Sequence, residues 1–116
     1  MLVPKDDSVQ VHAFTNGILF ACQVIDWVFA RHGIERVVVS SGHEPTAKHS
    51  VTSLHYSGNA IDCGYNSSAV PPHKRRQISD EIREALGLDY DVVHYESHMH
   101  VECQPRRRDA QDAKTN

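Results

Sequence analysis

Two short segments of the chain concentrate histidine and carboxylate side chains. The first covers residues 53–62 and reads SLHYSGNAID, and the second covers residues 95–102 and reads YESHMHVE. A catalytic zinc ion usually takes three protein ligands from histidine and carboxylate groups and keeps a fourth position for water. His55, Asp62 and His100 meet that requirement. We therefore interpret the two segments as the halves of one zinc centre, which the fold must bring together.

The second segment also supplies groups suited to moving a proton. In a β-strand alternate side chains lie on one face, and here these are His94, Glu96, His98, His100 and Glu102. Zinc lowers the pKa of a bound water from about 15.7 to roughly 7, and a nearby carboxylate must take the proton from that water. Glu96 is the predicted base, because it lies on this face just before the two closely spaced histidines. Glu102 is the alternative base, or it orients a ligand histidine.

Hydrophobic periodicity predicts the helices that position these segments. From Ser8 to His32 the apolar side chains recur at spacings of three and four, which predicts an amphipathic helix with Ser8 as its N-cap. Gly33 follows as its stop signal. A second amphipathic helix is predicted over residues 73–86, and residues 1–7 are expected to be a flexible lead.

Short runs of strand-forming residues predict four strands, at residues 35–41, 59–65, 90–94 and 98–103. Residues 42–57 are polar and are interpreted as a long loop, a kind of segment that tends to carry function. This order of elements predicts an α+β domain with helices packed on one face of a small, mostly antiparallel sheet. The domain is expected to span residues 1–105, and the polar residues 106–116 are expected to form a disordered tail.

Composition narrows the classes of function. A chain of 116 residues with 40% hydrophobic and 23% charged residues is typical of one soluble domain. The net charge of −3 offers no basic field for nucleic acid, and the arginine run at 106–108 lies in the polar tail. The first apolar stretch, residues 11–30, is interrupted by polar residues. Neither a secretory signal nor a membrane span is therefore predicted, and synthesis in the cytoplasm is expected. The small size predicts a monomer.

The cysteines are not predicted to bind metal. The chain has three, Cys22, Cys63 and Cys103, and they form no CxxC pair, which argues against a disulfide framework and a cysteine zinc site. Cys63 follows a predicted ligand, and Cys103 stands at odd parity to the histidine strand. Both are therefore predicted to point away from the metal into the core.

The pattern SLHYxGxAxD followed by YES and HxH resembles the zinc D-alanyl-D-alanine carboxypeptidases and the related signalling domain of hedgehog proteins. The resemblance covers roughly residues 37–105. It implies that His55, Asp62 and His100 bind zinc, that His98 lines the site, and that a glutamate ahead of it is the base. Bacterial and phage members cut peptidoglycan stem peptides, often as lysis enzymes that cross the membrane with outside help. The resemblance thus implies a zinc peptidase acting on the cell wall.

Two departures from that pattern concern the substrate and the base. Many peptidase members carry an arginine shortly after a Ser-Gly pair, and none follows Ser41-Gly42 here. The substitutes considered as hydrogen-bond donors are His43, His49 and His98, and Ser53 and Tyr56 are further candidates for substrate contact. Glu96 stands one residue later than the base of many phage-type members. The alternative function is therefore a catalytically inactive, hedgehog-like zinc domain that binds a partner.

Overall fold

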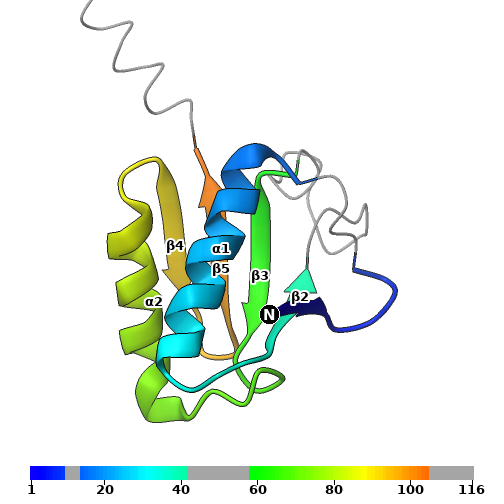
Figure 1. Ribbon diagram of the computed structural model, residues 1–116, viewed down its shortest axis with the longest axis vertical. Helices are drawn as coiled ribbons and strands as arrows, with labels where there is room; N and C mark the ends of the chain where they lie inside the picture. Colours follow the sequence, from blue (N-terminus) through cyan, green and yellow to red (C-terminus); the bar gives the residue numbers. More distant parts are fainter. Residues whose placement is uncertain (10–13, 42–57, 105–116) are drawn as a thin grey trace, which may run out of the picture.

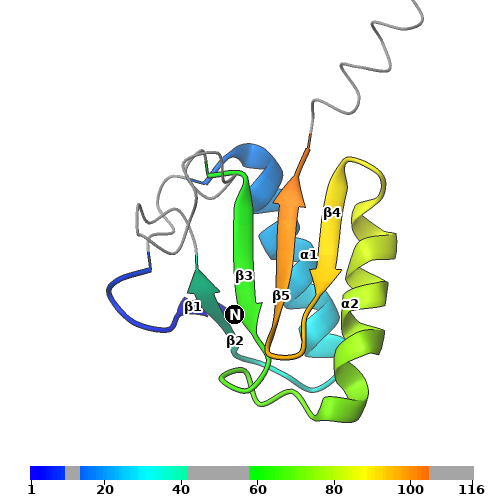
Figure 2. The same cartoon turned by 180° about the vertical axis from the view of Figure 1, so that it is seen from behind.

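The computed structural model describes residues 1–9, 14–41 and 58–104, in which two helices cover one face of a five-stranded sheet. Figure 1 shows the helices in front of the sheet, and Figure 2 shows the sheet from the side that faces away from the helices. The elements in chain order are β1 (Leu2–Pro4), α1 (Asn16–Arg31), β2 (Val37–Ser41), β3 (Ala60–Gly64), α2 (Pro72–Leu86), β4 (Tyr90–His94) and β5 (His98–Cys103). The strand order is β1-β2-β3-β5-β4, and only the β1–β2 pair is parallel. The predicted fold class is confirmed.

The first residues form an edge strand, so their prediction as a flexible lead was wrong. β1 pairs in parallel with β2, with Leu2 opposite Val37. Backbone hydrogen bonds fix both ends of this pair: Val37 donates to the Met1 carbonyl at 2.8 Å, and Lys5 donates to the Val39 carbonyl at 3.0 Å. Three residues are too few to display a period of two, and a proline at the strand end does not resemble a strand interior.

Helix α1 begins at Asn16, so the predicted cap at Ser8 was seven residues too early (the cap is residue 15 and not residue 8). Thr15 is the actual N-cap, because its side chain accepts a hydrogen bond from the backbone of Ile18 at 3.4 Å. The Thr15 hydroxyl also donates to the Asn59 side chain at 2.9 Å, next to β3. The apolar periodicity continues upstream of this cap, so the spacing alone could not locate the start. The predicted end at Gly33 agrees with the structure, where its φ is +80°.

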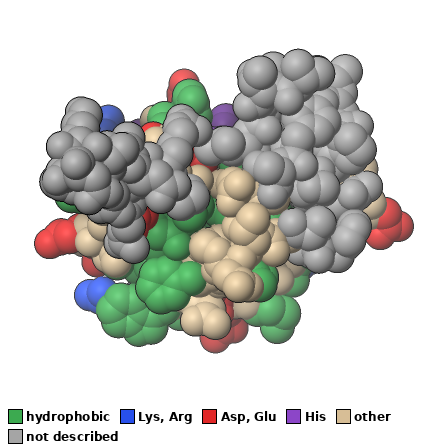
Figure 3. Space-filling model, turned by 90° about the horizontal axis from the view of Figure 1, so that it is seen from above, with side chains coloured by type: hydrophobic (Ala, Val, Ile, Leu, Met, Phe, Trp, Pro, Cys, Tyr) green, Lys and Arg blue, Asp and Glu red, His purple; other side chains and the backbone are tan. Residues whose placement is uncertain are grey.

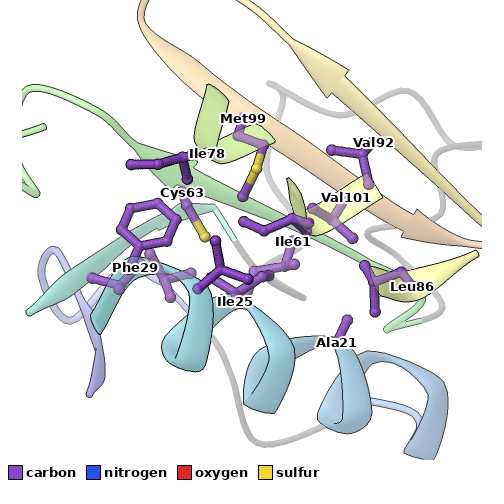
Figure 4. Packing of buried hydrophobic residues seen from close by; sticks show 14 of the residues in the cluster. Ala21, Ile25, Phe29, Ile61, Cys63, Ile78, Leu86, Val92, Met99 and Val101 are labelled. Atoms are coloured by element: carbon purple, nitrogen blue, oxygen red, sulfur yellow. The ribbon is translucent and has the colours of Figure 1, made fainter. Parts of the chain in front are cut away.

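The core lies between the two helices and the sheet. The buried stripe of α1 and that of α2 meet the inward side chains of β3 and β5 (Figure 4). Ile25 of α1, Ile78 of α2 and Met99 of β5 have no exposed surface. Cys63 is 0% exposed and Cys103 is 9% exposed within the same cluster, which confirms their predicted direction. Burial raises the pKa of Cys63, so this thiol stays protonated.

Helix α1 also leaves apolar side chains at the surface, where Leu19, Phe20 and Trp27 are each about half exposed (49%, 50% and 57%). Hydrophobic surface is visible in the view from above (Figure 3). Apolar side chains at the surface of α1 do not test the monomeric state, which stays a prediction. No helix in the described parts of the chain is long and apolar enough to cross a membrane.

Gly17 lets α1 approach the sheet closely, and its replacement by alanine is expected to destabilise the fold. A Cβ at this position would lie 2.6 Å from Sγ of Cys103. Such overpacking typically costs about 1–3 kcal/mol, which exceeds the gain in helix propensity of at most about 1 kcal/mol. We expect Gly17→Ala to lower the free energy of unfolding in urea.

A double-mutant cycle with Cys103→Ala isolates the contact between these two residues. In that background the added methyl group has room, so Gly17→Ala should cost less than it does alone. Equal costs in both backgrounds would show that the close approach does not set the preference for glycine.

Candidate metal centre

Asp62 and His100 are brought together by the pairing of β3 with β5, in which they are directly opposite each other. Oδ1 of Asp62 and Nδ1 of His100 lie 2.7 Å apart. Along β5, Met99, Val101 and Cys103 are buried, and the alternate side chains are partly exposed. Both predicted ligands therefore lie on the sheet face away from the helices, where their side chains are 16% and 19% exposed. The two residues are therefore adjacent, and their role as metal ligands stays a prediction.

Glu102 completes a row of three polar side chains. Its Oε1 lies 2.8 Å from Nε2 of His100, and its Oε2 accepts a hydrogen bond from the Gln104 side chain. The imidazole of His100 is thus held between two carboxylates. Burial lowers the pKa of His100, but the hydrogen bonds and charges of Asp62 and Glu102 outweigh it, so the net shift is upward. This geometry agrees with the predicted alternative in which Glu102 orients a ligand histidine.

The predicted single row of ionisable groups does not continue across the β4–β5 hairpin. His94 pairs with Met99, so it lies on the helix side of the sheet rather than beside His100. The turn between β4 and β5 changes which sheet face the alternate residues occupy. The prediction treated residues 94–102 as one uninterrupted strand and so missed this change. Glu96 lies in this turn and is exposed. The prediction for His94 was wrong, and the strand-parity argument for Glu96 is lost, although its role as base stays a prediction.

His98 lies on the same face as His100, at the start of β5. Its Nδ1 is 2.9 Å from Oγ of Ser97, and its ring stacks on that of Tyr95 with centroids 4.7 Å apart. The guanidinium of Arg75 in α2 supports the turn, because it donates a hydrogen bond to the Glu96 carbonyl at 3.3 Å. The His98 ring therefore has a defined orientation on the polar face.

His94 takes part in a separate polar contact beneath the hairpin. The Tyr65 hydroxyl and Nδ1 of His94 form a hydrogen bond of 2.7 Å, and burial raises the pKa of this tyrosine to about 12, so the hydroxyl keeps its proton and can donate it. Burial and, next, the positive charge of Arg76 lower the pKa of His94; Arg83 and Arg75 act in the same direction, and Asp80 opposes them. The folded protein therefore favours neutral His94.

We expect the burial of His94 near arginine side chains to make folding stability fall in mild acid. Because the pKa of folded His94 is below its ordinary value of 6.5, its stabilising contribution is complete above 6.5 and is lost as the pH falls toward the folded pKa. His94→Gln keeps an acceptor for the Tyr65 hydroxyl but does not titrate. Urea unfolding between about pH 5 and pH 8 should show a weaker pH dependence in the variant. An identical dependence in both proteins would contradict the prediction.

His55, the third predicted ligand, and His43, His49, Ser53 and Tyr56 all lie outside the described residues. Within the described part of the chain, no group of three His, Cys, Asp or Glu side chains is arranged to hold a metal ion. The donor chemistry of Asp62 and His100 nevertheless suits zinc, which binds carboxylate oxygen and imidazole nitrogen, and the carboxylate on the far nitrogen is typical of zinc-bound histidine.

Known proteins resemble this chain over part of its length. It is 35% identical over 80 residues to Indian hedgehog B protein of Danio rerio, which is 69% of this chain and 18% of that protein. It is 31% identical over 77 residues to Indian hedgehog protein of Gallus gallus, which is 66% of this chain and again 18% of that protein. The chain thus spans less than a fifth of the length of these relatives. No family model matches it. These findings support the hedgehog part of the resemblance as a weak, partial similarity.

A pocket beside Asp62 was missed by sequence reasoning. Its volume is about 420 Å³. Among the described residues it is lined by Lys5, Ser40, Ser41, Asp62, Gly64, Asn66, Ser67, Ser97 and His98. These residues come from separate segments, several of them loops, and no spacing in the sequence links them. A register shift in β2 places Ser41 opposite Asp62, and the sequence did not indicate this shift either.

Proposed function

We propose that this chain is a zinc-dependent peptidase that hydrolyses peptidoglycan stem peptides, as a D-alanyl-D-alanine carboxypeptidase or as an endopeptidase. The observation that carries the proposal is the row of Asp62, His100 and Glu102 on the sheet face away from the helices. A carboxylate and an imidazole stand side by side there, and a second carboxylate orients the imidazole. His55 is the third ligand in this proposal, as the resemblance implies.

The residues of the chain have distinct tasks in this proposal. Zinc, when bound, supplies a coordinated water with a pKa of roughly 7 and polarises a carbonyl oxygen. Glu102 accepts a hydrogen bond from the Nε2–H of His100, so Nδ1, on the side of Asp62, would be the nitrogen that holds the metal. Glu96, exposed in the β4–β5 turn, takes the proton of the attacking water and passes it to the leaving amine. His98, held by Ser97 and Tyr95, donates a hydrogen bond to the substrate carbonyl.

A second candidate function is a hedgehog-like zinc domain that binds a partner without turnover. The observation that favours it is that both of the relatives described above are hedgehog proteins. Glu96 lies in the turn before the strand that carries His100. The strand register therefore does not fix this glutamate beside the proposed metal ligands, as a catalytic base would need. The two candidates share the metal and differ in hydrolysis.

The test is to incubate zinc-loaded protein with purified peptidoglycan and to identify the released products by mass spectrometry. Protein treated with a chelator and then reloaded with zinc is the matched control. Zinc-dependent release of D-alanine would establish a carboxypeptidase, and zinc-dependent release of larger peptides an endopeptidase. If one zinc ion stays bound per chain and nothing is released, the peptidase proposal fails and the partner-binding candidate replaces it.

A further inference from the structure

The β4–β5 turn, residues 95–97, lies between the paired ends of its two strands and carries the proposed base Glu96. One backbone hydrogen bond closes it, from the Tyr95 amide to the His98 carbonyl at 2.9 Å. Strand register fixes the side chains of β5, but it does not fix a side chain within the turn. If Glu96 is to act on a reacting water, other contacts must hold the turn in place.

Tyr65, the residue after β3, contacts both sides of this turn. Its backbone amide donates to the Ser97 carbonyl at 3.0 Å, and its hydroxyl is hydrogen-bonded to Nδ1 of His94 at 2.7 Å. The tyrosine is 0% exposed, so its ring is held by the packed core. Tyr65 therefore attaches the turn to the body of the sheet.

Arg75 of α2 joins three segments around the turn with one guanidinium group. Its Nη1 donates to the Glu96 carbonyl at 3.3 Å. Its Nη2 donates to Oδ1 of Asn66 at 2.7 Å, and its Nε donates to the Val70 carbonyl at 3.0 Å. The same group lies 5.4 Å from the centre of the Tyr65 ring. The helix, the connection between β3 and α2, and the turn are thus linked through a single side chain.

The arrangement of these acceptors suits arginine and no shorter or simpler cation. A guanidinium presents five N–H donors in a rigid planar fork, so each of its three nitrogens can serve a different segment. A lysine at position 75 would keep the positive charge, but its ammonium is a compact point charge on a flexible stem. Arg75→Lys therefore removes the fork and leaves the net charge unchanged.

We propose that Arg75 is a positioning residue, which holds the β4–β5 turn so that Glu96 keeps a fixed place beside the proposed metal centre. This inference rests on the proposed function, because a glutamate that takes part in the reaction needs such placement. Arg75 contacts the backbone of the turn and not the reacting atoms. Misplacement of a reacting group by about 1 Å can cost about 100-fold in rate. Loss of the fork should therefore lower kcat.

Two variants make the same chemical change at neighbouring positions. Arg75→Lys is the test, and Arg76→Lys is the matched control. Arg76 follows directly in α2 and is exposed, and its side chain has no hydrogen bond within the described parts of the chain. Circular dichroism and zinc content should be unchanged in both variants, because the pairing of β3 with β5 does not depend on either arginine.

The first measurement is amide hydrogen exchange by NMR, which does not depend on hydrolysis. The Tyr95 amide closes the turn, and the Tyr65 amide bonds to it. We expect both to exchange about tenfold faster in Arg75→Lys, as the loss of one hydrogen bond of ordinary strength predicts. The Cys103 amide, which donates to the Asn59 carbonyl at 2.8 Å at the other end of β5, is the internal reference and should not change.

The second measurement separates kcat from KM for a soluble stem peptide that ends in D-alanyl-D-alanine. Arg75→Lys should lower kcat by about 10–100-fold with little change in KM, since the turn places a reacting group and the remaining substrate contacts are intact. Arg76→Lys should match the wild-type protein in both constants. A role of Arg75 in folding alone would leave kcat per folded, zinc-loaded molecule unchanged.

Unchanged exchange of the Tyr95 and Tyr65 amides in Arg75→Lys would overturn the hold of Arg75 on the turn. Faster exchange with an unchanged kcat would overturn its positioning role in the reaction. If the wild-type protein releases no product, the peptidase proposal fails, and the expected effect on kcat fails with it. The exchange rates then still decide whether Arg75 holds the turn, so the two failures are distinguishable.

Discussion

Replacement of His100 by alanine is expected to remove bound zinc and to abolish hydrolysis. His100 is opposite Asp62 in the sheet and is fixed by Glu102 through its other nitrogen. A three-ligand catalytic site that loses one ligand retains too few protein donors to hold the ion with an open position for water. Zinc content after dialysis, measured by elemental mass spectrometry, should fall from one ion per chain to near none.

The matched control is His73→Ala, because His73 is exposed in the first turn of α2 on the helix side of the molecule. This variant should keep its zinc and its activity. Circular dichroism of both variants would establish that the sheet is intact, since His100 lies on the face without the core. Stoichiometric zinc in His100→Ala would exclude this histidine as a ligand and place the metal elsewhere.

The sequence was most informative where one side of an element is buried. The spacing of Ile78, Ile82 and Leu86 predicted α2, and these three side chains are buried. The alternation around Met99 and Val101 likewise predicted β5 and its two faces. Burial of one face imposes a period on the residues, and that period is readable without a structure. Elements without it, such as the three-residue β1, were missed.

Two of the predicted ligands lie side by side in the structure, their role as ligands stays a prediction, and the surroundings of the candidate site were less predictable. His100 and Asp62 were identified by their types and by a resemblance, and the β3–β5 register brings them together. The faces of Glu96 and His94 depended on the number of residues in a hairpin turn, which alternation does not encode. The residues that line the pocket beside Asp62 come from separate segments, which only the tertiary structure brings together. No local sequence pattern encodes contacts between residues that are far apart along the chain.

We expect the Glu96→Gln and Glu102→Gln variants to lose activity for different reasons. Glu96→Gln removes the proposed base but no contact of His100, so zinc content should be unchanged while kcat falls by about 10²–10⁴-fold. Glu102→Gln changes the partner of His100 Nε2 from a carboxylate to an amide. Zinc affinity should then fall by about 10–100-fold, and activity should recover at saturating zinc.

Measuring kcat at several zinc concentrations separates the two roles, because a base cannot be replaced by added metal. Glu84→Gln, which is exposed on α2, is the control for loss of one negative charge. If Glu102→Gln stays inactive at saturating zinc while Glu96→Gln is active, then the base is Glu102, and the exposed turn has no catalytic part. That result would also mean that the carboxylate holding His100 takes the proton of the water itself, so one side chain would combine both tasks.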